Sequence, residues 1–285
     1  MKPIPAAQAE RMYSRNWTRQ TPGAIHSNRA MHQVSIITPS FNQARFLPAT
    51  LASVREQDYP NLEQIVVDGG STDGSVDLLR AAPQVRWVSA PDRGQVDALN
   101  KGFRLASGDI LAWLNSDDTM DPDCVRLAVE TLERTGADLV YGDLDLVDEQ
   151  GALIREFHGI PFDLPILLYG INYIGQQTVF FRRALLGKAG PLRAEFDNAF
   201  DYELWLRMAR HGRFVHDPRL RGQIRKHPAA KSIAAAAVTL REVQRIRAEY
   251  WTAGGLPVWL RHQPWFTAVN YWFRLKRQWR VRTDG

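Results

Sequence analysis

The sequence has almost no cysteine and no long apolar run. Cys124 is the single cysteine of the chain, so an internal disulfide and a cysteine-based metal cluster are both excluded. The longest apolar stretch, 160–174, is interrupted by two prolines, an aspartate and an asparagine, and a bilayer span needs about 20 apolar residues. No apolar segment of the secretory type follows Met1. We therefore expect a soluble or peripheral protein in a reducing compartment.

The positive charge of the chain lies at its two ends. The 285 residues carry a formal net charge of +5. Residues 1–33 hold five basic and one acidic side chain, and residues 256–285 hold six and one. The stretch 34–255 is therefore net acidic, with a charge of −4. A nucleic-acid-binding protein concentrates basic charge on its folded body, so this distribution argues against a nucleic-acid partner.

Strand-like and helix-like segments alternate after residue 33. Short β-branched runs predict strands over 34–38, 62–67, 85–88 and 110–114, and helical spacing is present over 46–56, 75–80 and 95–106. This alternation predicts a mainly parallel, Rossmann-like α/β sheet flanked by helices. Ligand-binding residues are then expected in the loops that follow the strands, which are 39–42, 68–73, 92–94 and 115–118.

Two of these loops have a composition suited to a phosphorylated ligand. Residues 68–75 (DGGSTDGS) combine glycines with helix-capping hydroxyls, which suits either anion binding or a tight turn before a capped helix. The loop is not the G-x-G-x-x-G of dinucleotide-binding proteins. Asn115, Asp117 and Asp118 form a hard oxygen set that suits Mg²⁺ or Mn²⁺ bound together with a diphosphate. The alternative for this second loop is a polar turn that caps the next helix.

Asp201 and His227 are candidate functional residues of the second half. Asp201 begins an amphipathic helix. It either stabilises the helix through a favourable interaction with the helix dipole or acts as a general base. His227 is either a metal ligand or an ordinary surface or hydrogen-bonded histidine.

A basic, tryptophan-rich segment ends the chain. Four of the nine tryptophans lie within 256–285, and Trp265, Trp272 and Trp279 share one face of a predicted helix. This pattern is typical of a helix on an anionic membrane surface, and equally of a terminal helix that packs on the protein body.

The ordered motifs resemble those of the family 2 glycosyltransferases. They are residues 34–42 (VSIITPSFN), 51–62 (LASVREQDYPNL), 66–74 (VVDGGSTDG), 92–102 (DRGQVDALNKG) and 114–118 (LNSDD). The resemblance covers about 34–230 and implies a GT-A fold, with a nucleotide-sugar half over 34–120 and an acceptor half over 121–230. A loosely ordered basic extension, 1–33, then precedes this domain, and a helical C-terminal extension, 231–285, follows it.

The resemblance also implies roles for individual residues. The implied donor-binding residues are Pro39, Ser40, Asn42, Asp68, Asp73, Arg93, Asn100 and Asn115, with Asp68 accepting from the base and Asp73 bracing its loop. The implied ligands of a Mn²⁺ or Mg²⁺ cofactor are Asp117, Asp118 and His227, and the implied catalytic base is Asp201. The chain departs from the family pattern at Asn115 and Phe200, where relatives have acidic residues, and at Leu99, where many have arginine.

The resemblance therefore implies an inverting, hexosyltransferase-type enzyme of cell-surface polysaccharide synthesis. It moves a sugar from a nucleotide sugar, with UDP favoured, to a hydroxyl of a glycan or lipid-linked acceptor. We expect it in the cytoplasm, peripheral on the inner face of the plasma membrane through 256–285. A sugar nucleotidyltransferase is one alternative, although residues 38–42 are not a glycine-rich phosphate loop. A membrane-associated nucleotide-binding or scaffold protein without turnover is the other.

Overall fold

The computed structural model describes residues 31–228, 230 and 235–252. The predicted extension 1–33 and the tryptophan-rich segment 256–285 therefore lie wholly or almost wholly outside the described residues. Among the helices that are described, none is long and apolar enough to cross a membrane.

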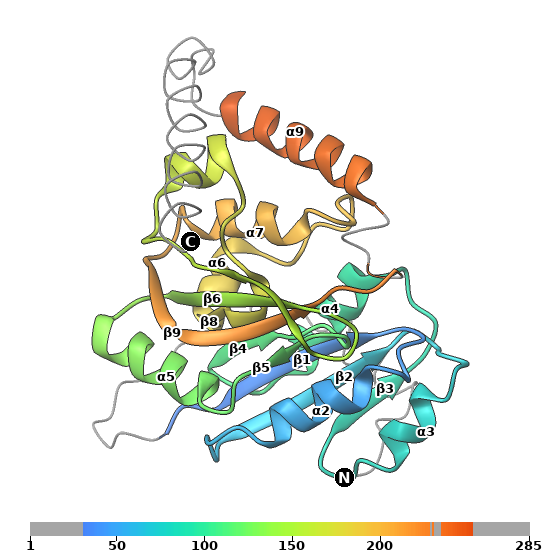
Figure 1. Ribbon diagram of the computed structural model, residues 1–285. Helices are drawn as coiled ribbons and strands as arrows, with labels where there is room; N and C mark the ends of the chain where they lie inside the picture. The colour runs from blue at the N-terminus through green and yellow to red at the C-terminus, as the bar shows by residue number, and fades with distance from the viewer. Residues whose placement is uncertain (1–30, 229, 231–234, 253–285) are drawn as a thin grey trace, which may run out of the picture.

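One mixed sheet runs through the described part of the chain, in the order β3-β2-β1-β4-β8-β6-β9-β5, with β7 paired to β6 (Figure 1). Its first half is parallel, as predicted. This half consists of β1 (Val34–Ser40), β2 (Leu62–Asp68), β3 (Arg86–Ser89) and β4 (Ile110–Trp113). The second half is mixed and contains β5 (Thr119–Met120), β6 (Leu139–Val147), β7 (Leu153–Phe157), β8 (Phe180–Arg182) and β9 (Phe214–Arg225).

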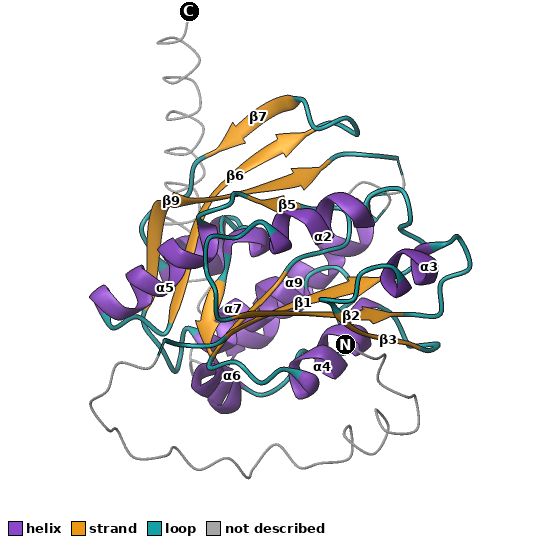
Figure 2. Ribbon diagram, turned by 90° about the horizontal axis from the view of Figure 1, so that it is seen from below, coloured by secondary structure: helices purple, strands orange, loops and turns teal. Residues whose placement is uncertain are grey.

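Helices cover both faces of this sheet (Figure 2). On one face lie α2 (Leu47–Arg55) and α5 (Cys124–Thr135), and on the other α4 (Gln95–Leu105) and α6 (Arg183–Ala189). The remaining helices are α3 (Ser75–Arg80), α7 (Phe200–Met208), α9 (Ala236–Thr252) and the short η1 (Ile166–Gly170) and η2 (Gln176–Thr178). The predicted α/β architecture is confirmed.

Successive side chains of a strand point to opposite faces of the sheet, so β1 contributes to the core on both faces. Along β1, Ile36 packs in the cluster that includes α5, whereas Ile37 packs in the cluster that includes α4 and α7. Trp113 at the end of β4 is fully buried and stacks on Trp205 of α7, with ring centroids 5.2 Å apart. The apolar contact between β4 and α7 therefore joins the two halves of the chain beneath the loops that follow the strands.

A pair of glycine substitutions tests how closely α4 packs on β1. A Cβ atom added at Gly102 would lie 2.3 Å from Cγ2 of Ile37, whereas one added at Gly187 in α6 would meet nothing within 4 Å. We expect Gly102→Ala to lower the free energy of unfolding by about 1–3 kcal/mol through overpacking. Gly187→Ala should raise it by about 0.5–1 kcal/mol, since alanine is the better helix former. Urea unfolding of both variants measures this, and equal midpoints would contradict it.

Candidate functional site

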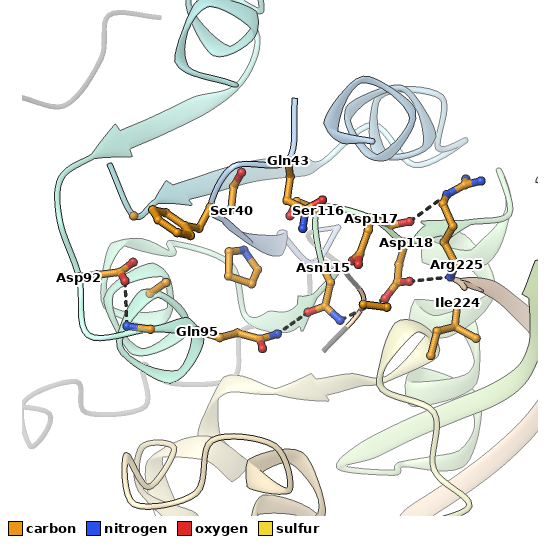
Figure 3. A pocket seen from close by; sticks show the side chains of 16 residues that line it. Ser40, Gln43, Asp92, Gln95, Asn115, Ser116, Asp117, Asp118, Ile224 and Arg225 are labelled. Atoms are coloured by element: carbon orange, nitrogen blue, oxygen red, sulfur yellow. Dashed lines mark hydrogen bonds between the residues drawn. The ribbon is translucent and has the colours of Figure 1, made fainter. Parts of the chain in front are cut away.

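A cavity of about 520 Å³ opens where the strands of the first half end (Figure 3). Its walls come from the predicted loops and from the end of β9. They consist of Pro39, Ser40, Phe41, Gln43, Gly69, Asp92, Gly94, Gln95, Ala98, Asn115, Ser116, Asp117, Asp118, Ile224, Arg225 and Ala230. Asp92 lies at one end in Figure 3, and Asp117, Asp118 and Arg225 lie at the other. The parallel strands thus bring Pro39, Ser40, Asn115, Asp117 and Asp118 together.

Asn42 and Asp73 connect the loops after β1 and β2. The Asn42 backbone N–H donates to Ser71 Oγ at 2.7 Å, and its side-chain oxygen accepts from the N–H of Thr72 at 2.9 Å. Asp73 accepts from the N–H of Ala44 at 2.8 Å and from the hydroxyl of Ser75 at 2.6 Å. Burial opposes ionisation of Asp73, but these hydrogen bonds outweigh it and lower the pKa of the carboxyl. Both residues brace the cavity wall without lining it.

Asp68 is fully buried beneath the same turn. Its Oδ2 accepts from the N–H groups of Gly70 and Ser71 and from the hydroxyl of Ser89, and its Oδ1 accepts from the hydroxyl of Ser71. These hydrogen bonds engage both carboxylate oxygens, and Asp68 is not part of the cavity lining. Asp68 therefore stabilises the turn. Its predicted contact with the nucleobase stays a prediction.

Asp92 presents a carboxylate to the cavity instead. A Cβ atom at Gly69 would lie 3.0 Å from Oδ2 of Asp92, so this carboxylate fills the space that a side chain at position 69 would enter. Oδ1 of Asp92 accepts from the N–H of Gly94 at 2.8 Å, and burial raises the pKa of the carboxyl. Phe41, with 61% of its surface exposed, contributes an aromatic face to the same cavity.

Arg93 and Asn100 lie outside the cavity lining. The side chain of Arg93 is 87% exposed and lies 3.5 Å from Asp97. Asn100 makes two hydrogen bonds with the backbone of Leu192, at 2.9 and 3.0 Å, and so ties α4 to the loop before α7. A nearby residue without an individual prediction, Gln95, lines the cavity and donates to Oδ1 of Asn115 at 2.8 Å.

The acidic end of the cavity separates the roles of its two aspartates. Oδ2 of Asp117 lies 3.0 Å from Nε2 of the buried His227. Asp118 is 3% exposed and accepts from the side chain of Gln177 at 2.8 Å and from the N–H of Arg225 at 3.1 Å. Burial, followed by repulsion from Asp117, raises the pKa of Asp118. Asp117 and Asp118 therefore both line the cavity, with Asp118 held by several hydrogen bonds and the buried His227 in contact with Asp117.

The donor set at this end fits a divalent cation. A carboxylate and an imidazole nitrogen are both ligands of Mn²⁺, and two adjacent carboxylates at a buried position favour added positive charge. Asn115 uses its oxygen on Gln95 and its amide N–H on Asp118, so it orients the acidic loop. No group of three or more histidine, cysteine or acidic side chains that could hold a metal is found in the described ranges. A cation here would take its remaining ligands from a bound diphosphate and water.

Asp201 is the second residue of α7 and is partly exposed. Its Oδ2 accepts from the side-chain amide of Asn172 at 3.2 Å, and its Oδ1 accepts from the N–H of Tyr202 at 2.7 Å. Desolvation of the carboxyl outweighs these hydrogen bonds and raises the pKa of Asp201 to about 6. A carboxylate with this pKa can accept a proton near neutral pH.

Phe200, the departure from the family pattern beside Asp201, belongs to the core. It is 6% exposed, and its ring lies 6.4 Å from that of Trp113. The other acidic residue of α7 is Glu203, which is fully buried and forms an ion pair with Arg207 at 2.7 Å. Asp201 is not among the residues that line this cavity.

Known glycosyltransferases are similar to this chain in sequence. The family model described as Glycosyl transferase family 2 matches residues 35–188. An uncharacterized glycosyltransferase of Mycobacterium tuberculosis is 39% identical over 180 residues, which cover 62% of this chain and 68% of that protein. A PGL/p-HBAD biosynthesis glycosyltransferase of Mycobacterium bovis is 36% identical over 183 residues, which cover 61% and 68%.

Solved structures are similar in fold at low sequence identity. TarS 1-349 of S. aureus in complex with UDP-GlcNAc gives a TM-score of 0.64 at 18% identity, over 79% of this chain and 68% of that one. The chain spans 40% of a longer TarS chain. The mannosyltransferase PcManGT of Pyrobaculum calidifontis, in complex with GDP-Man and Mn²⁺, gives 0.56 at 20% identity, over 98% and 89%.

Proposed function

The chain belongs to glycosyltransferase family 2 and has the GT-A fold, and we propose that it is an inverting enzyme that uses a UDP-sugar. The proposal rests on the cavity. Its lining contains the exposed ring of Phe41 and the carboxylate of Asp92, and at its acidic end Asp117 contacts His227. An aromatic face and a hydrogen-bond acceptor suit a nucleobase, and a cation-binding pair suits a diphosphate. UDP-GlcNAc bound to TarS supports this donor class.

The proposed reaction is a single displacement at the anomeric carbon. Asp201 accepts the proton of the acceptor hydroxyl as the oxygen attacks, and the bond from the anomeric carbon to the nucleoside diphosphate breaks. Asp117 and His227 would hold a divalent cation, which supplies positive charge to the diphosphate leaving group. Asn115 and Gln95 hold the acidic loop in place. Leaving-group charge is the main difficulty of this reaction, so preorganised electrostatics should supply the largest part of the rate.

The acceptor that we propose is a hydroxyl of a glycan or lipid-linked molecule. The names of the mycobacterial relatives that refer to PGL/p-HBAD biosynthesis support this class.

The proposed membrane contact depends on residues 256–285, which lie outside the described residues. Flotation with anionic liposomes, comparing the full chain with a chain ended at Gly255, tests that contact. Equal soluble fractions would argue against it.

A donor panel tests the proposed function directly. The full chain is incubated with UDP-glucose, UDP-galactose, UDP-GlcNAc and GDP-mannose, with Mn²⁺ and with EDTA, and released nucleoside diphosphate is measured. We expect release from a UDP-sugar that depends on the cation. Absence of both release and UDP binding would contradict the proposal and favour a protein without turnover.

Asp92 should contribute to nucleotide affinity. Replacing it with alanine removes a carboxylate from the cavity lining, and a hydrogen bond to a charged group is worth about 1.5–3 kcal/mol. We expect Asp92→Ala to weaken UDP binding by about tenfold or more in calorimetry and to reduce its preference over CDP. The double variant Gly69→Asp/Asp92→Ala places a carboxylate in the same space and should regain affinity. Unchanged UDP affinity in Asp92→Ala would contradict the assignment, with exposed Asp77→Ala as the control.

A further inference from the structure

Glu242, on the helix that follows the family motifs, binds the backbone just before the helix of Asp201. Its Oε1 accepts from the N–H of Asp197 at 2.9 Å, and its Oε2 accepts from the N–H groups of Asn198 at 2.9 Å and Ala199 at 2.8 Å. Ala199 is the residue that immediately precedes α7. Backbone N–H groups at the start of a helix lack intrahelical partners, and negative charge is favoured there. A carboxylate of α9 thus fixes the entry into α7.

Arg247 lies five residues further along α9 and binds the chain close to Asn172, the other residue that supports Asp201. Its guanidinium donates to the carbonyl oxygen of Gly170 at 2.6 Å and to the hydroxyl of Tyr202 at 3.3 Å. Gly170 is two residues before Asn172, whose amide donates to Asp201. One helix therefore contacts both segments that orient the Asp201 carboxylate.

Packing against the protein core holds α9 in place. Ile246 is fully buried in the core cluster that also contains Trp205, and the hydroxyl of Tyr250 donates to the buried Glu203 at 3.0 Å. Figure 1 shows α9 lying over α7. The family model ends at residue 188, so these contacts come from a part of the chain beyond it.

We propose that α9 is a positioning element of the catalytic site, in which Glu242 and Arg247 hold the two segments that orient Asp201. The proposal rests on the proposed function, because it assigns Asp201 the role of base. A shift of about 1 Å in a reacting group can cost about 10²-fold in rate. Loss of the Glu242 carboxylate leaves three N–H groups without their partner and frees the start of α7 to move. The cavity residues that hold the nucleotide are not bonded to α9, so donor binding should survive.

The test compares Glu242→Ala and Glu242→Gln with Gln244→Ala, a control on the exposed face of the same helix. UDP release from the preferred UDP-sugar is measured with Mn²⁺ from pH 4.5 to 8. Calorimetry with UDP gives the binding affinity, and its stoichiometry counts the folded sites. We expect Glu242→Ala to lower kcat by about 10- to 100-fold per UDP-binding site. UDP affinity should change less than about threefold, and the acid limb of the kcat profile should move to lower pH as water reaches Asp201.

The glutamine variant keeps one oxygen acceptor and should lose less, about three- to tenfold in kcat. It decides the outcome if the alanine variant does not fold. A wild-type kcat and acid limb in the folded variants would overturn the proposal, as would a Gln244→Ala variant that loses as much as Glu242→Ala. Failure of the proposed function is a different result, since wild type and Gln244→Ala would then neither bind UDP nor release it.

Discussion

Asp201→Asn is expected to lower UDP release from the preferred UDP-sugar by about 10²- to 10⁴-fold, the usual cost of removing a general base. The amide has nearly the same shape as the carboxyl, so the contact with Asn172 and the packing of α7 should remain. Since Asp201 does not line the donor cavity, UDP affinity should stay within about twofold of wild type. Single-turnover rates and calorimetry on the same preparation measure both quantities.

The pH dependence of the wild-type enzyme gives an independent measure of the same residue. The base acts in its ionised form, and the pKa of Asp201 is raised to about 6. The rate should therefore be maximal above about pH 7 and fall about tenfold per unit below pH 6. Asp109→Asn, at an exposed position, serves as the control and should keep this profile. Near-wild-type turnover in Asp201→Asn would remove Asp201 from the role of base.

The sequence was sufficient to predict the parallel half of the sheet and the loops that gather at its edge. Short β-branched runs locate the parallel strands, and the carboxyl ends of parallel strands lie at one edge, so the loops of Ser40, Asn115 and Asp117 are expected to meet. This inference needs strand positions and topology alone. It therefore holds even though the second half of the sheet is mixed in direction.

The direction of each polar side chain could not be obtained in this way. Asp68 ends β2 and Asp92 follows β3, yet Asp68 turns inward to four hydrogen-bond donors while Asp92 fills the space beside Gly69. Phe200 shows the same limit, because its burial against Trp113 depends on how α7 packs on β4. The hydrogen bonds from Glu242 to the start of α7 join residues more than 40 positions apart. No local sequence pattern predicts a contact at this separation.

Asp117→Ala is expected to abolish the cation dependence of UDP binding. The variant removes the carboxylate that lines the acidic end of the cavity and contacts His227. Loss of a residue that merely supports a metal ligand costs about 10- to 100-fold in metal affinity, so loss of a ligand itself should cost at least as much. In calorimetry with Mn²⁺, UDP affinity should therefore fall to the value measured for wild type in EDTA.

The fold should survive this substitution, which makes the binding result interpretable. Asp117 repels the buried Asp118 and raises its pKa, so its removal relieves an unfavourable interaction while the bonds of Asp118 to Gln177 and Arg225 remain. The melting temperature should stay near that of wild type, and the exposed Asp77→Ala variant should match wild type in both assays. His227→Ala should resemble Asp117→Ala, because the two side chains would hold the same ion. Mn²⁺-dependent UDP binding that persists in Asp117→Ala would exclude this pair as the cation site.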